Sequence, residues 1–260
     1  MCKLFFKLIA VSLRSQMQYP ASFLMLLVSH FLGTLVDILG IWVLFDRFNI
    51  IQGWSLFEVG IIYGIIHMGF ALAETFARGF DEFWKMIKYG DFDRVLLRPI
   101  SPLMQLAASD VQIMRIGRFM QGLIVCVWSA RELSIPLLSH DVLIILSCIL
   151  GTACLFYGLF VIQAAISFWT VETLELMNIT TFGGLQMGQY PLSIYNTTLR
   201  SLLTFVLPIA CVVYYPIATI LKHEALSPWI ALTPMCGVIF LIAACRFWYF
   251  GVRYYRTTGS

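Results

Sequence analysis

The chain has 260 residues, of which 60% are apolar and only 12% are charged, and its mean hydropathy is +0.86. A soluble domain carries about twice that charged fraction, so the composition excludes a soluble enzyme or binding module. The apolar residues form continuous runs, not alternating segments of about ten residues, which favours membrane-spanning helices over a β-barrel. The net charge of +3 gives no reason to expect nucleic-acid binding.

Residues 3–18 are predicted to form a helix that lies in the membrane interface. Leucine, isoleucine and phenylalanine recur there at helical spacing, while Lys3, Lys7 and Arg14 occupy the other side. The chain is expected to turn into the membrane at Tyr19-Pro20. The alternative is an anchored leader with no mechanical role.

A helix needs about 20 apolar residues to cross a hydrocarbon core of roughly 30 Å. Five runs meet this requirement, although arginines lie at or within the ends of the third. They are Phe23–Phe45, Phe57–Ala77, Ile116–Ile135, Val142–Trp169 and Trp229–Phe250. Within the second run, Gly60 and Gly64 have the spacing of a close helix crossing.

A sixth crossing is predicted between residues 170 and 222, where two apolar stretches compete. Residues 174–190 contain several polar side chains, whereas residues 202–221 are broken by Pro208 and Pro216. One stretch is expected to cross and the other to be re-entrant, and which one crosses stays open. Residues 191–222 are predicted as a re-entrant segment outside the cytoplasm, within a single all-α domain of six spans.

Lysine and arginine predict the orientation, because basic loops are retained in the cytoplasm. With the N-terminus inside, the outer side keeps only four of the chain's 17 basic residues, namely Arg47, Arg131, Arg200 and Lys222. Both termini and the loop after the second run are therefore predicted to be cytoplasmic.

That loop, residues 80–102, is the most informative part of the chain. Phe80, Phe83, Trp84 and Ile87 indicate a short amphipathic helix, and Gly90 is expected to end it. Further on, an apolar knob that includes Leu96 and Leu97 is flanked by charged residues. Such a knob fits a helix-in-groove contact with another protein, since the apolar side chains supply buried area and the charges set register. The alternative is an ordinary solvated loop.

Ionisable residues inside predicted spans are candidates for function, because an unpaired charge in hydrocarbon costs about 3 kcal/mol or more. Asp37 and His67 lie within the first and second runs, where each faces a polar pathway or pairs with the other. For Glu74 the simpler interpretation is an ion pair with Arg78, one helical turn away. All three are retained as possible pathway or gating residues, with a structural hydrogen bond as the alternative for Asp37.

No catalytic or metal-binding constellation is predicted. The chain has no G-x-x-x-x-G-K-[ST] loop, so no ATP hydrolysis is expected from it. Asp91 and Asp93 have the spacing of a metal pair, but no further acids converge on them in sequence. The cysteines lie mostly in or beside apolar runs, where they behave as small hydrophobes.

Two segments carry a resemblance to a known family. Gly90-Asp-Phe-Asp-Arg-Val-Leu-Leu-Arg-Pro-Ile-Ser-Pro102 resembles the G-x-[LF]-D-x-x-L-[LI]-R-P-[IV]-x-P signature of ABC-2 family permeases, the membrane subunits of bacterial ATP-driven exporters. Residues 189–195 and the stretch 199–216 with its prolines are similar to the part of that family between its fifth and sixth spans. The family's plan of six spans, with a cytoplasmic loop after the second, is also the plan predicted here.

The resemblance implies that residues 80–102 include a coupling helix that docks into a separate ATPase subunit. It implies that ATP and magnesium are bound by that partner, and that this chain holds no cofactor. A second permease subunit, identical or related, and a bacterial inner membrane are implied as well. The residues implied in ATPase coupling are Phe83, Trp84, Asp91, Asp93, Arg94, Leu96, Leu97, Arg98 and Pro99.

Two other functions remain open from the residues alone. In a proton-coupled secondary transporter, Asp37 and His67 would carry the protons. In a membrane-embedded lipid-modifying enzyme, Asp91 and Asp93 would supply the chemistry. The substrate is not readable from the sequence, although a lipid, a peptide or a hydrophobic drug suits apolar walls.

Overall fold

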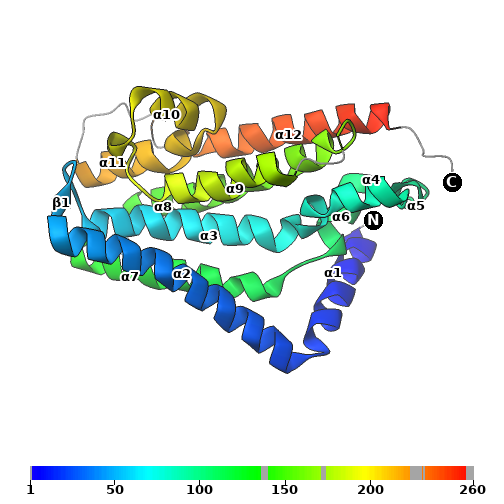
Figure 1. Ribbon diagram of the computed structural model, residues 1–260, viewed down its shortest axis with the longest axis horizontal. Helices are drawn as coiled ribbons and strands as arrows, with labels where there is room; N and C mark the ends of the chain where they lie inside the picture. Colours follow the sequence, from blue (N-terminus) through cyan, green and yellow to red (C-terminus); the bar gives the residue numbers. More distant parts are fainter. Residues whose placement is uncertain (1, 136–139, 171–173, 223–229, 231, 256–260) are drawn as a thin grey trace.

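A computed structural model describes residues 2–135, 140–170, 174–222, 230 and 232–255 of the chain. The long helices run side by side in an elongated bundle (Figure 1). Strands β1 (Ile50–Ile51) and β2 (Trp54–Ser55) form a small antiparallel hairpin with Ile50 opposite Ser55. The described α-helices are α1 (Cys2–Met17), α2 (Pro20–Phe48), α3 (Leu56–Asp81), α4 (Phe83–Tyr89), α5 (Phe92–Leu96), α6 (Pro102–Ser109), α7 (Ile116–Glu132), α8 (His140–Ile166), α9 (Leu174–Gly188), α10 (Thr197–Ser201), α11 (Tyr215–Lys222) and α12 (Met235–Tyr254).

The predicted all-helical membrane architecture is confirmed. Within the described residues, five helical segments are long and apolar enough to cross a membrane, and a sixth is counted only if one bent helix pair is taken as a span. The five are Pro20–Phe48, Leu56–Tyr89, Ile113–Glu132, His140–Ile166 and Met235–Tyr254, which match the five apolar runs. The expected start of the last run, Trp229, lies outside the described residues.

Helix α3 occupies the centre of the bundle. Its most apolar window is 78% buried, compared with 11% for α2, because α7, α8 and α9 pack around it. At Gly64 an added Cβ would lie 2.5 Å from Cys126 Cβ and 2.7 Å from the Gly122 carbonyl oxygen of α7. The close crossing predicted from the Gly60 and Gly64 spacing is therefore confirmed, and it requires residues without a side chain at the contact.

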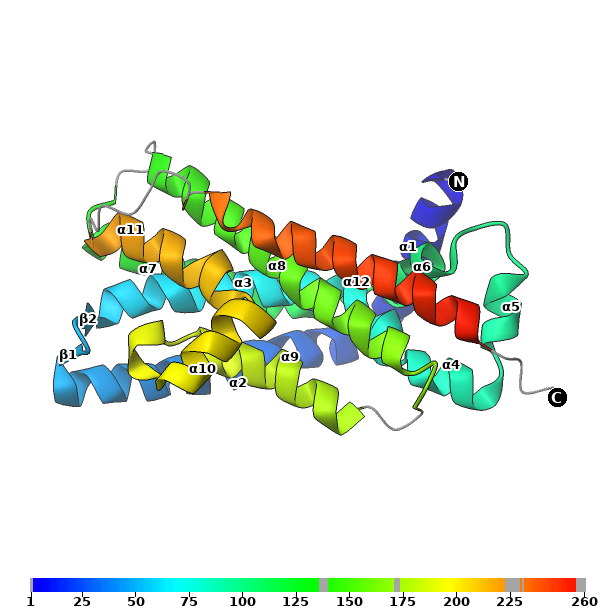
Figure 2. The same cartoon turned by 90° about the horizontal axis from the view of Figure 1, so that it is seen from above.

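The chain between α8 and α12 consists of two parts, and each part occupies one half of the bundle's length. Helix α9 starts at the end of the bundle that carries α4 and α5, and it stops at Gly188 against Ile66 of α3. Residues 197–206 and 210–222 occupy the other half, near β1 and β2, and meet at a bend of 84° (Figures 1 and 2). The bend falls at Pro208, which lacks the backbone N–H that a continuous helix needs.

Around this bend the helical hydrogen bonding is irregular. Two short π-helical pieces, η3 (Leu202–Val206) and η4 (Ala210–Tyr214), flank it. Two one-turn 3₁₀ helices, η1 (Ile113–Arg115) and η2 (Leu192–Ile194), precede α7 and α10. Lys222, at the end of α11, forms a 2.7 Å ion pair with Glu58 in the first turn of α3. This pair ties the end of α11 to the hairpin end of the bundle.

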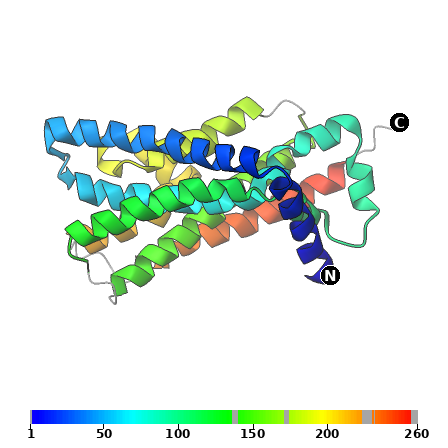
Figure 3. The ribbon, with the colours of Figure 1, turned by 90° about the horizontal axis from the view of Figure 1, so that it is seen from below.

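Helix α1 leaves the bundle axis at Tyr19-Pro20, as Figure 3 shows. It packs on α6, and the Ser12 hydroxyl accepts a 3.0 Å hydrogen bond from the Val111 backbone N–H. The Gln16 side-chain amide donates to the Val111 carbonyl oxygen. The helix predicted for residues 3–18 is thus present and attached to the segment before α7, while its place in the membrane interface stays a prediction.

Candidate functional site

Residues 80–102 form a folded protrusion at one end of the bundle, beside α1 and the C-terminal end of α12 (Figure 1). Helix α4 ends at Gly90, whose φ of 73° lies in the left-handed region, as the sequence predicted. Helix α5 follows, and the next turn is fixed by Gln105 of α6. The Gln105 side-chain amide donates 2.8 Å hydrogen bonds to the carbonyl oxygens of Val95 and Ile100. The backbone around the predicted knob is therefore held on both sides.

An aromatic cluster anchors this protrusion to the bundle. It joins α4 and α5 to the ends of α8 and α12. Ring centroids lie 5.0 Å apart for Phe83 and Phe92, 4.8 Å for Phe83 and Trp248, and 4.9 Å for Phe92 and Tyr255. Phe168, just after α8, lies 5.1 Å from Trp248. The Phe168–Trp248 pair is tilted, whereas the other three are edge-to-face, and aromatic pairs of that geometry each contribute about 0.5–1.5 kcal/mol beyond burial.

Phe83 is wholly buried in this cluster. It lies beneath the protrusion and not on its surface, so its contribution is to support α4. The sequence pattern selected Phe83 because it belongs to the apolar face of α4. It missed Phe92, Phe168, Trp248 and Tyr255, which are brought together only by the packing of helices distant in sequence.

The knob itself faces outward. Leu97 is 86% exposed and Leu96 is 43% exposed. Charged side chains surround them: Arg94 is 82% exposed and lies 3.4 Å from the Asp91 carboxylate. Arg98 and Pro99 are exposed as well. An apolar knob with a charged rim is therefore presented on a rigid support.

Two residues of the predicted coupling set lie at the margin of the protrusion. Trp84 is half-buried, with the ammonium groups of Lys85 and Lys88 each 5.9 Å from its ring. Asp93 is half-buried and interacts with Tyr255, the residue just after α12. Burial, and then the neighbouring Asp93 carboxylate, raise the pKa of Tyr255. Asp93 is thus oriented toward the bundle, whereas Asp91 faces outward.

The predicted ion pair between Glu74 and Arg78 is wrong. Glu74 is buried and pairs with Arg115 and Arg118, each at 3.0 Å. Arg78 binds the carboxylates of Asp81 and Glu82 instead. The reason is that Glu74 faces the start of α7, while acidic partners for Arg78 lie within one turn at the end of α3. Glu74 therefore links α3 to α7 inside the bundle.

Asp37 and His67 do not pair with each other, but two glutamines of the α9 region lie between them. His67 Nε2 lies 3.1 Å from Gln189 Oε1, and the Gln189 amide donates a 2.7 Å hydrogen bond to Gln186. Gln186 in turn donates to the Asp37 carboxylate at 3.5 Å. The His67 ring is wholly buried and stacks on Tyr63 at 4.0 Å. Sequence reasoning selected neither glutamine as a site residue: Gln189 begins the segment 189–195 that resembles the family, and Gln186 lies outside any motif.

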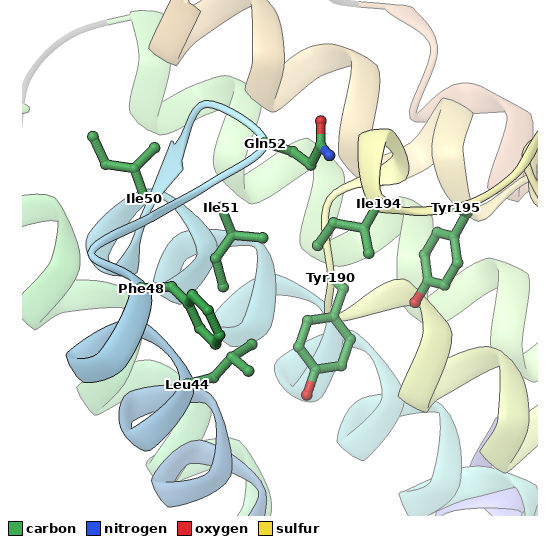
Figure 4. Close-up of a pocket in the computed structure, with 8 residues that line it drawn as sticks. All are labelled: Leu44, Phe48, Ile50, Ile51, Gln52, Tyr190, Ile194 and Tyr195. Atoms are coloured by element: carbon green, nitrogen blue, oxygen red, sulfur yellow. The ribbon is translucent and has the colours of Figure 1, made fainter.

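A pocket of about 600 Å³ opens between the C-terminal part of α2 and the chain after α9 (Figure 4). Its walls are mainly aliphatic and aromatic, with the tyrosines and one amide as polar groups. The lining residues are Leu44, Phe48, Ile50, Ile51, Gln52, Tyr190, Ile194 and Tyr195. Tyr195 is held in place by a 2.8 Å hydrogen bond from its hydroxyl to the Met187 carbonyl oxygen. The size is that of a site for a small molecule.

Among the described residues, no group of three or more His, Cys, Asp or Glu side chains has the arrangement of a metal site. A family model described as "ABC-2 family transporter protein" matches residues 31–259. No curated protein and no solved structure matches the chain. The matched range includes the protrusion, the buried polar residues and the pocket.

Proposed function

The chain belongs to the ABC-2 family of transporter proteins, and from this premise we propose that it is the permease subunit of an exporter driven by a separate ATPase. It is a multi-pass membrane protein of a transport family, with no catalytic role of its own in that family. The proposal adds the direction of transport, the partner that supplies energy, and the surface on which this partner docks.

The observation that carries the proposal is the exposed knob of residues 80–102. Leu96 and Leu97 stand out from a protrusion whose underside is fixed by the aromatic cluster. A soluble partner gains buried apolar area from these leucines, and Arg94 and Arg98 at the rim determine its orientation. A rigid support is what transmission of force requires, because a loose loop would absorb the partner's movement.

Two series of side-chain contacts connect the knob to the membrane-spanning helices. One runs through Phe92 to Trp248 and so to α12. The other runs through Gln105 and α6 to the start of α7, where Arg115 and Arg118 pair with Glu74 of α3. Closure of the ATPase would thus move α12 and the α3–α7 pair together.

The proposed topology places the knob, both termini and the ATPase on the cytoplasmic side of a bacterial inner membrane. The shared position of α1, residues 80–102 and the end of α12 supports this arrangement (Figure 1). In the proposal α9, with 15 residues, is the fifth span instead of the bent pair. Residues 191–222 are then re-entrant from the outer side, because both arms of the pair lie in one half of the bundle (Figures 1 and 2). A second permease subunit, the same or a related chain, would complete the pathway.

In this assembly ATP and Mg²⁺ belong to the ATPase subunit, where hydrolysis occurs. The permease contributes the spans and the docking surface. Lipid surrounds the bundle, in keeping with the exposed apolar side chains along α2 and α12.

The structure disfavours the proton-coupled transporter. A proton moving from Asp37 to His67 would have to pass through Gln186 and Gln189. A carboxamide donates and accepts hydrogen bonds, but it does not readily gain and release a proton near neutral pH. The glutamines therefore interrupt the path that this mechanism needs.

The lipid-modifying enzyme is disfavoured by the positions of the two aspartates. Asp91 is exposed and lies beside Arg94, whereas Asp93 faces Tyr255. The carboxylates thus have different surroundings, and neither lines the 600 Å³ pocket. They do not form a shared reaction centre.

The test is co-purification of the protein from its native membrane in mild detergent. We expect a soluble ATPase to accompany the parent protein and to be lost from the double variant Leu96→Asp/Leu97→Asp. The matched control, Leu96→Met/Leu97→Met, keeps the apolar knob and should retain the ATPase. Retention by the aspartate variant, or absence of an ATPase from the parent, would overturn the proposal.

A further inference from the structure

We propose that the pocket between α2 and the chain after α9 binds amphipathic organic cations, with the apolar body in the pocket and the cationic group directed toward Asp37. This inference rests on the proposed transport function and specifies its class of substrate. It follows from the pocket's shape and lining, from the position of one carboxylate, and from the lack, among the described residues, of a cation paired with that carboxylate.

The pocket suits the apolar part of such a molecule. Its volume of about 600 Å³ lies within the usual range for drug-sized ligands. Leu44 and Phe48 of α2 face Tyr190 and Ile194 across it (Figure 4). Burial of a hydrophobic body between these walls removes apolar area from water or from the lipid boundary.

Asp37 lies on the same stripe of α2 as the pocket wall. Residues 37, 44 and 48 are separated by seven and four positions, so their side chains share one face of the helix. Asp37 is about two turns from Leu44, or about 10 Å along the axis. The carboxylate is also close enough to the phenol of Tyr190 to interact with it electrostatically. Tyr190 itself lines the pocket, so the carboxylate and the pocket lie in the same region of the bundle.

Within the described part of the chain, Asp37 has no ion pair with a lysine, arginine or histidine. The buried or half-buried carboxylates Glu58 and Glu74 each have a basic partner at 3.0 Å or less. Asp37 instead accepts one long hydrogen bond, 3.5 Å, from Gln186. A carboxylate within a span is costly without a counter-charge, so a cationic ligand gains where a neutral one does not.

The aromatic rings strengthen the preference for a cation. Tyr190 and Tyr195 both line the pocket, and the face of a tyrosine ring attracts an ammonium or phosphonium group. Gln52 and Gln186 can accept hydrogen bonds from a protonated amine. An anionic amphiphile would meet the same apolar walls but would be repelled by Asp37.

The test uses the purified chain in lipid nanodiscs and two probes with the same apolar body and opposite charged ends, (4-phenylbutyl)trimethylammonium and 4-phenylbutanesulfonate. Equilibrium dialysis should show saturable binding of the cation, and binding of the anion at least tenfold weaker after correction for empty nanodiscs. Asp37→Asn should weaken binding of the cation at least tenfold. The matched control is Asp46→Asn on the same helix, where the exposed carboxylate lies outside the pocket, and its affinity should equal that of the parent.

A second variant tests the pocket independently, in case Asp37→Asn loses binding because it folds poorly. Leu44→Trp fills the pocket without changing charge and should reduce binding of the cation with Asp37 intact. Equal binding of both probes, or parent-like affinity in either Asp37→Asn or Leu44→Trp, would overturn the inference. These measurements need no ATPase, so their failure is distinct from a failure of the co-purification test.

Discussion

Phe92 determines whether the protrusion of residues 80–102 acts as a rigid body. Its ring is wholly buried and contacts Phe83, Phe168, Trp248 and Tyr255. Replacing a buried phenylalanine by alanine costs about 3–5 kcal/mol, from lost transfer free energy and from the cavity left behind. Helix α5 has only five residues and no side-chain N-cap, so it has little local stability to offset this loss. We therefore expect Phe92→Ala to detach α5 while the spans remain packed.

The assay is amide hydrogen exchange of the protein in nanodiscs, followed by mass spectrometry of the peptides that cover residues 83–98. The reporters are amides that bond locally, such as Leu97 N–H to the Asp93 carbonyl oxygen at 3.2 Å. Since each 1.4 kcal/mol is a factor of ten, a loss of about 3–5 kcal/mol predicts exchange faster by about 100-fold to about 4,000-fold, or by less if the unprotected rate is reached first.

The control is Leu97→Ala in the same peptide. Leu97 is 86% exposed, so its truncation should leave exchange unchanged. Exchange in Phe92→Ala equal to that of the parent would refute the claim that the aromatic cluster holds α5. Equal acceleration throughout α3 and α8 would refute the claim that the effect is local.

Three further predictions concern the bundle and the knob. Glu74→Gln leaves two half-buried arginines without their buried carboxylate and should destabilise the protein by about 3–5 kcal/mol in detergent unfolding, whereas Glu82→Gln, at a partly exposed pair, should cost about 1 kcal/mol or less. Gly64→Ala drives a methyl group into α7 and should cost about 1–3 kcal/mol in the same assay, whereas Gly33→Ala meets open space and should not destabilise. Gln105→Leu removes both hydrogen bonds that hold the turn and should weaken ATPase binding without weakening the spans.

Each of these has a contrary outcome. Equal decreases in the free energy of unfolding for Glu74→Gln and Glu82→Gln would mean that burial of Glu74 does not increase the contribution of its ion pairs to stability. A Gly64→Ala protein as stable as the parent would show that α3 and α7 can separate without cost. Parent-like affinity of Gln105→Leu for the ATPase would show that the turn needs no support from α6.

Several features were predictable because they depend on neighbouring residues. Long apolar runs locate the five clear spans, since the hydrocarbon core admits little else of that length. Gly90 ends α4 because glycine adopts positive φ without strain. Pro208 breaks its helix because it has no N–H to donate. In each case the cause lies within one or two turns of the residue.

The internal contacts were not predictable in this way. Glu74 forms ion pairs with Arg115 and Arg118, about forty positions away, and not with the neighbouring Arg78. His67 finds Gln189 at a separation of 122 residues. No periodic pattern distinguishes these partners from other polar residues, because the choice depends on how the helices rotate against one another.

The sequence by itself therefore determined the class of protein, the approximate spans and the surface loop with its apolar knob, since these follow from hydropathy and local backbone preference. Only the tertiary structure decided that Phe83 supports the loop from within the bundle. It also decided that two glutamines in and just after α9 lie between Asp37 and His67, and that the face of α2 that carries Asp37 continues into the wall of an apolar pocket. The physical reason is that burial and pairing are properties of helices packed together, and each helix sequence is compatible with several neighbours until close packing selects one.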